Sequence, residues 1–144
     1  AKPAINLNAL GVGFGSVTEI LTLARAFEDV GVTAYGGAAP LILNKTVLGA
    51  AARILAVEAE HSGNIRLQVA LNNVHTTALD GVDILPPPSG KQYFSDVQNG
   101  IAQTQVRTPG QVLWIVYGFQ ANVMSGGFFP DGVNGTINRS SGKA

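Results

Sequence analysis

Residues 44–69, NKTVLGAAARILAVEAEHSGNIRLQV, carry the longest helical pattern of the chain and decide its fold. When this segment is wound at 100° per residue, one stripe combines apolar side chains with Glu58 and His61. We therefore expect a long helix that packs on its neighbour through this stripe. Its members are Val47, Ala51, Ile54, Glu58, His61 and Ile65.

Glu58 and His61 have the Glu-x-x-His spacing, which points both side chains from one helix face toward a shared metal ion. A carboxylate and an imidazole on a buried stripe are costly unless a metal or a hydrogen-bond partner satisfies them. The structural alternative is that His61 is a hydrogen-bonded core residue, which is the more common role of a single His on an apolar face. The motif alone leaves both interpretations open.

Residues 16–35 predict a second helix. Ser16 followed by Glu19 is a capping box, which marks a helix N-terminus. Two adjoining apolar stripes run along the segment, as is typical of a helix that packs on more than one neighbour. Glu28 lies at the edge of this apolar arc, whereas Arg25 and Asp29 are expected further toward solvent.

The two helices are expected to form an antiparallel hairpin. Residues 36–43 contain two Gly and one Pro, which break the helical pattern, and Asn44 is a suitable N-cap for the next helix. A link this short makes consecutive helices antiparallel neighbours. In such a hairpin Glu28, Glu58 and His61 can converge near the middle, and we predict these three residues as metal ligands.

Several blocks of the chain follow one another in an order that resembles a known family. They are FEDVGVTAY at 27–35, GAAPL at 37–41, ILAVEAEH at 54–61, RTPGQVL at 107–113 and GGFFP at 126–130. The first two blocks look like the third helix of ferritin-like proteins of the desiccation-related type, and the block at 54–61 looks like their fourth helix. The last two blocks resemble the tail of those proteins.

The resemblance implies a mainly α fold. It is a ferritin-like antiparallel helical hairpin, half of a four-helix bundle, followed by a loop-rich, Gly/Pro-rich C-terminal extension with one short helix. The first two helices of such proteins carry one Glu and a further Glu-x-x-His, and nothing before Ser16 resembles them. We therefore expect either a processed or partial chain, or a natural half bundle. In both cases the hairpin has an apolar face without a partner in this chain.

Two copies of the hairpin would restore the ligand set that the resemblance implies. A carboxylate-bridged site takes one Glu from each of two helices and Glu-x-x-His from each of the other two. A pair of chains would supply Glu28, Glu58 and His61 twice each. This set suits iron, manganese or zinc, and we expect iron or manganese, with two ions per pair of chains. Glu58 would bridge the ions, Glu28 would be a terminal ligand, and His61 would bind through one ring nitrogen.

The pattern divides the chain into four parts. They are an extended N-terminal arm (1–15), the ferritin-like helical hairpin (16–71), an irregular Pro-containing segment (72–107), and a short helix with an extended Gly/Asn-rich tail (108–144). Within them, residues 93–106 are ambiguous between irregular chain and short strands.

Further signals lie at the two ends of the chain. Thr108, Pro109 and Gln111 form a helix N-terminus, with a capping Thr, Pro in the first turn and Gln at the third position. The tail beyond this helix and the apolar arm at residues 3–10 are candidates to reach into a neighbouring subunit.

Composition narrows the possible partners. The 144 residues have no net charge, 12% charged residues against about 25% in typical soluble domains, and 46% hydrophobic residues. The balance offers no attraction for nucleic acid, and no apolar run is long enough for membrane insertion. Low charge favours packing against other copies, as a homodimer or a larger, even polymeric, assembly. The sequence fits a mature secreted protein, extracellular or periplasmic.

Two classes of function remain. The first, which we favour, is a self-associating ferritin-like protein with a structural or stress-protective, desiccation-related role, in which the metal site is completed between subunits. The second is an enzyme, a di-iron or di-manganese oxidoreductase such as a ferroxidase or a peroxide-consuming enzyme, formed by paired hairpins. Low charge and the elaborated termini favour the first, whereas Glu28, Glu58 and His61 favour the second.

Overall fold

The computed structural model describes residues 2–93, 97–98 and 101–143, and it confirms a mainly helical fold. None of the helices described is long and apolar enough to cross a membrane. In chain order the elements are α1 (Val17–Ala38), the 3-10 turn η1 (Ala39–Leu41), α2 (Lys45–Leu71), the strands β1 (Val97–Gln98) and β2 (Ile101–Ala102), and α3 (Pro109–Val116).

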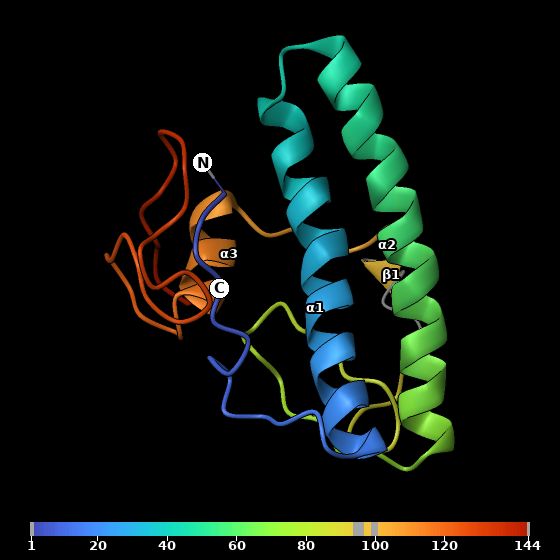
Figure 1. Cartoon of the computed structure of the whole chain (residues 1–144). Helices are drawn as coiled ribbons and strands as arrows, with labels where there is room; N and C mark the ends of the chain where they lie inside the picture. The colour runs from blue at the N-terminus through green and yellow to red at the C-terminus, as the bar shows by residue number, and fades with distance from the viewer. Residues whose placement is uncertain (1, 94–96, 99–100, 144) are drawn as a thin grey trace.

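The two long helices stand side by side as the expected antiparallel hairpin (Figure 1). Both begin at the predicted caps. The Ser16 side chain accepts a hydrogen bond from Glu19 N, and the Asn44 side chain accepts from Thr46 N and Val47 N. These side chains satisfy first-turn amides that have no carbonyl partner within the helix. The caps therefore set where each arm of the hairpin starts.

Helix α1 continues through Gly36 and Gly37, so the prediction that these glycines break it is wrong. The backbone near Arg107 passes against this turn, and Arg107 N donates a hydrogen bond to Thr33 O at 3.0 Å. A Cβ atom at Gly37 would overlap the carbonyl group of Arg107. Glycine is needed here because a second backbone approaches the helix closely.

Two charged residues of α1 that were expected toward solvent are buried. Arg25 is 1% exposed and Asp29 is 5% exposed. Arg25 Nη1 lies 2.6 Å from Asp83 Oδ2. Asp29 accepts hydrogen bonds from Ser62 Oγ at 2.6 Å and from Arg66 Nη1 at 2.7 Å. The prediction failed because partners from distant parts of the chain allow these charges to be buried.

The core stripe predicted for α2 is also largely wrong. Val47 and Ile54 are 53% and 42% exposed, and Ala51 is the one apolar member of the stripe that is buried. The buried side of the helix instead carries Ser62 and Val69. Polar contacts to α1 and to the following loop decide which side of α2 faces inward. The apolar stripe is left largely open to solvent.

The segment after α2 lies behind the hairpin in the view of Figure 1 and is fastened to it by arginine side chains. Arg66 on α2 contributes most, because its guanidinium donates hydrogen bonds to three backbone carbonyls of this segment. The acceptors are Ile84 O at 2.6 Å, Gln92 O at 2.9 Å and Tyr93 O at 2.8 Å. Strands β1 and β2 pair in antiparallel register farther along. One broad face of the hairpin is thus covered.

The C-terminal part packs beside α1. Thr108 and Gln111 form the capping box of α3, as the sequence predicted. Phe128 lies against Phe27 of α1, with ring centroids 5.1 Å apart. Asn6 N donates a hydrogen bond to Phe128 O at 2.9 Å. In the single chain the N-terminal arm therefore bonds to the tail of its own chain.

Candidate functional site

Glu28, Glu58 and His61 lie together near the middle of the hairpin. Glu28 comes from α1, and the other two residues come from α2. His61 Nδ1 is 3.4 Å from Glu28 Oε2, and the carboxyl group of Glu58 lies close enough to Glu28 for Glu28 to raise the pKa of Glu58. The structure therefore brings together the three side chains that the sequence analysis selected.

Gly31, which the sequence analysis did not single out for the site, makes this arrangement possible. It lies about one turn beyond Glu28 on α1. A Cβ atom at Gly31 would overlap the carboxylate of Glu58. The absence of a side chain lets the Glu58 carboxylate reach the backbone of α1. The available signal was the three-residue spacing of Glu28 and Gly31, which places both on one helix face.

The cluster is only partly shielded from solvent. The Glu28 side chain is 22% exposed, whereas the His61 side chain is 57% exposed. The expectation that Glu58 and His61 sit on a core stripe is therefore wrong, because they lie at the edge of the hairpin. The reason is that Ser62 and Arg66 occupy the inward side of α2.

One oxygen of the cluster lacks a hydrogen-bond partner. Glu28 Oε2 is buried and accepts no hydrogen bond from any described atom. A buried carboxylate oxygen without a partner costs free energy, of order 1–3 kcal/mol or more. A cation or a donor from another molecule would remove that cost.

Burial and a neighbouring carboxyl group dominate the electrostatics of Glu58. Burial raises the pKa of Glu58, and the neighbouring Glu28 carboxyl group raises it further. His61 opposes both effects with a smaller lowering of this pKa. Two carboxyl groups that share one hydrogen bond hold a proton more readily than isolated ones. This environment favours either a proton or a metal ion.

A metal ion would find half of a site in one chain. Across the described residues, no group of three or more His, Asp or Glu side chains is placed to hold a metal ion. The donors themselves, two carboxylates and one imidazole, suit iron or manganese. The unpartnered oxygen of Glu28 also fits an ion, and further ligands must come from outside the chain.

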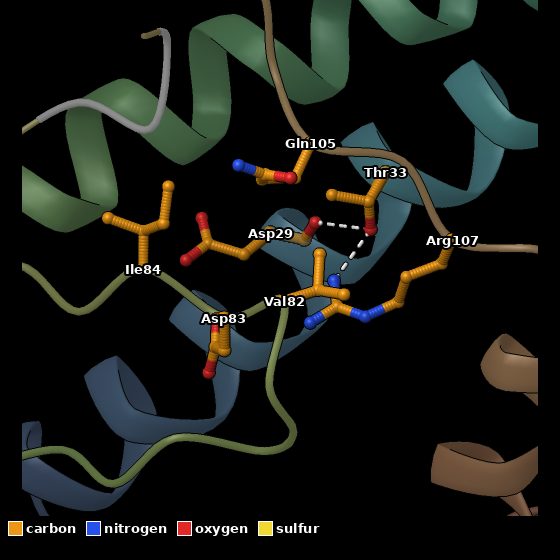
Figure 2. Close-up of a pocket in the computed structure, with 7 residues that line it drawn as sticks. All are labelled: Asp29, Thr33, Val82, Asp83, Ile84, Gln105 and Arg107. Atoms are coloured by element: carbon orange, nitrogen blue, oxygen red, sulfur yellow. Dashed lines mark hydrogen bonds between the residues drawn. The ribbon is translucent and has the colours of Figure 1, made fainter. Parts of the chain in front are cut away.

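The cavity shown in Figure 2 has a different role. Its volume is about 10 Å³, room for about one water molecule. Thr33 Oγ1 donates to Asp29 O at 3.0 Å and accepts from Arg107 Nη1 at 2.6 Å. Arg107 also bonds to both oxygens of Asp80, at 2.7 and 2.8 Å. These polar groups fasten the loop to the hairpin, and they leave little capacity for a ligand.

A larger hollow lies along α2. Its volume is about 430 Å³, and all of its lining residues come from this one helix. They are Ala50, Arg53, Ile54 and Val57. Ile54 and Val57 recur at helical spacing with His61, so the hollow continues the face that carries the cluster. Because all lining residues come from one helix, the hollow does not enclose a small molecule. It is better suited to contact with another protein surface.

The fold and the cluster define a helical-hairpin protein with paired carboxylates and an imidazole at its centre. Residues 1–71, which contain both long helices, match the family of the ferritin-like domain. Residues 1–71 are therefore similar to a ferritin-like domain, and residues 72–144 lie outside the matched region. Comparisons with curated proteins and with solved structures gave no significant match.

Proposed function

We propose that this chain is a self-associating ferritin-like protein with a structural or stress-protective, desiccation-related role. Its metal site would be completed when two copies meet. The observation that carries the proposal is the convergence of three side chains at the edge of the hairpin: Glu28 Oε2 is buried, makes no hydrogen bond, and lies beside Glu58 and 3.4 Å from His61 Nδ1. The blocks at 107–113 and 126–130 support the desiccation-related type, because they resemble that family outside the matched domain.

The proposed roles follow from the positions of the three side chains. Glu58 would bridge two ions of iron or manganese, Glu28 would bind one ion, and His61 would bind through a ring nitrogen. Each chain would provide one such set. The bound ions would neutralise the carboxylates and link the two chains, so that metal binding stabilises the assembly.

An oxidoreductase is the second candidate. A ferroxidase or a peroxide-consuming enzyme needs the same donors, and the partial exposure of His61 would give a small substrate access. We favour the structural role because a single chain holds only half of the donor set. The low charge of the chain also suits close packing between copies outside the cell or in the periplasm.

A metal titration of the purified chain tests the proposal. Isothermal titration with Mn²⁺ or Fe²⁺ should give about one ion per chain. Glu28→Gln should weaken binding by at least tenfold. Glu60→Gln is the matched control, because Glu60 is an exposed carboxylate on the same helix as Glu58. Equal affinity for the two variants, or no binding by the parent chain, would contradict the proposed site.

A further inference from the structure

One broad face of the hairpin, here called the open face, carries exposed apolar side chains on both helices. On α1 it includes Val17 and Ile20, which are 60% and 49% exposed. On α2 it includes Val47, Ile54 and Val57, which are 53%, 42% and 47% exposed. In Figure 1 no described segment crosses in front of the middle of the hairpin. The apolar residues thus lie on both sides of the Glu28, Glu58 and His61 cluster, and exposed apolar side chains that gather on one face mark interaction sites.

The opposite face of the hairpin is already occupied. Arg25 and Arg66 bind the backbone of the segment after α2, at Thr77 O and at three further carbonyls. Their carboxylate partners, Asp29 and Asp83, are buried with them. The hairpin thus has one face closed by polar contacts and one open apolar face.

The open face is large enough for a stable dimer. A 22-residue helix such as α1 is about 33 Å long, and two packed helices are about 20 Å wide, which gives a face of roughly 660 Å². A standard interface buries about 800 Å² on each partner. Side chains make the surface uneven, so its accessible area is larger than this flat estimate. Pairing over the full face therefore buries about as much area as a standard interface.

The polar groups at the centre of this face are self-complementary. The Glu28 side chain is 22% exposed and can accept a hydrogen bond, and the His61 side chain beside it is 57% exposed and can donate one. When a donor and an acceptor lie side by side on a surface, two copies of the chain can pair through that surface around a two-fold axis. The donor of each copy then faces the acceptor of the other copy. A different partner would need a separate match for both groups and for the apolar residues around them.

We infer that the open face pairs with the same face of a second copy, around a two-fold axis that passes beside Glu28 and His61. This inference rests on the proposed function in taking a second copy as the partner at that site. Apolar contacts through Ile20, Ile54 and Val57 hold the pair together without metal. Metal ions strengthen the pairing and are not required for it.

Sedimentation velocity in EDTA tests this interface. The parent chain should sediment as a dimer, at twice the 14.9 kDa mass of one chain. Ile54→Arg should give a monomer, because it places a charge in the apolar contact. Leu67→Arg is the matched control, since Leu67 is 39% exposed and Ile54 is 42% exposed on the same helix. The two positions lie about 140° apart around the helix axis.

A second variant protects the test against misfolding. Ile20→Arg changes the other helix of the open face and should also give a monomer with the helical circular dichroism of the parent. A monomeric parent chain in EDTA, or dimers of both Ile20→Arg and Ile54→Arg, would overturn the inference.

The metal readout separates this inference from the proposed function. Parent dimers in EDTA that bind no Mn²⁺ would support the interface and refute the metal site. Mn²⁺ binding by chains that stay monomeric would refute the interface and leave the ligands in place. Glu58→Gln should keep the dimer in EDTA and lose the further stabilisation by Mn²⁺.

Discussion

Asp29 on α1 accepts a hydrogen bond from the guanidinium group of Arg66 on α2 at 2.7 Å, at a fully buried position. This pair joins the two helices and anchors the loop behind them. It also accounts for the polar buried side of the hairpin and for the apolar residues on the open face. The ion pairs therefore help to decide which surface of the hairpin stays open to solvent.

Asp29→Asn should destabilise the chain strongly. The change leaves Arg66 buried without its carboxylate, and breaking a buried ion pair from one side costs about 3–5 kcal/mol. Urea denaturation should show this loss as a lower transition midpoint. Asp131→Asn, at an exposed residue of the tail, should leave the free energy of unfolding within about 0.5 kcal/mol of the parent value. A similar small effect at Asp29 would show that the pair contributes little.

The pairing of Asp80 with Arg107 should make stability depend on acid pH. Burial opposes ionisation of Asp80, but the hydrogen bonds and charge of Arg107 outweigh it and lower the pKa of Asp80 below 3.8. A carboxyl group with a lowered folded pKa contributes stability above its unfolded pKa and loses it as the pH falls through the folded value. Unfolding free energies between pH 6 and pH 2 should therefore fall less steeply for Asp80→Asn than for the parent. Parallel curves would contradict this role.

Glu58→Gln should raise the melting temperature of the metal-free chain at pH 7. Burial and the Glu28 carboxyl group raise the pKa of Glu58 above 4.5. The folded state then holds this proton more tightly than the unfolded state, so stability falls as the pH rises from 4.5 through the raised pKa. The advantage of Gln should disappear below pH 4.5, and a melting series in EDTA measures it. The same variant should fail to gain stability from Mn²⁺.

Two glycine-to-alanine variants compare a closely packed position at the site with an open position on the surface of α2. Gly49→Ala on α2 meets nothing within 4 Å, and it should stabilise the chain by about 0.5–1 kcal/mol. Gly31→Ala places a methyl group in the space of the Glu58 carboxylate. It should give no such gain and should weaken Mn²⁺ binding. Urea denaturation and metal titration of both variants check this, and equal stabilisation by the two would contradict the close contact.

The sequence predicted the hairpin well because helix caps and helical periodicity are local signals. Ser16, Asn44 and Thr108 each cap the helix that their sequence context predicts. The same periodicity, with the hairpin connection, predicted that Glu28, Glu58 and His61 lie near the middle of the two helices. The structure brings them together there. Their role as metal ligands stays a prediction.

The errors arose where distant residues decide the outcome. Arg25 is buried because Asp83, 58 positions later, neutralises it. Gly37 lies inside a helix because the backbone of Arg107 packs against it. The stripe with Ile54 faces outward because the inward side of α2 carries Ser62, Arg66 and Val69. Local pattern cannot reveal such contacts, since each depends on a partner that is far away in the chain.

Native mass spectrometry of the Mn²⁺-loaded chain tests the central claim most directly, because it reports chain number and metal number in one spectrum. We expect pairs of chains that carry two ions, and pairs of the Glu28→Gln variant that carry none. Single chains with or without bound ions, or pairs that never bind metal, would contradict a metal site completed between two copies.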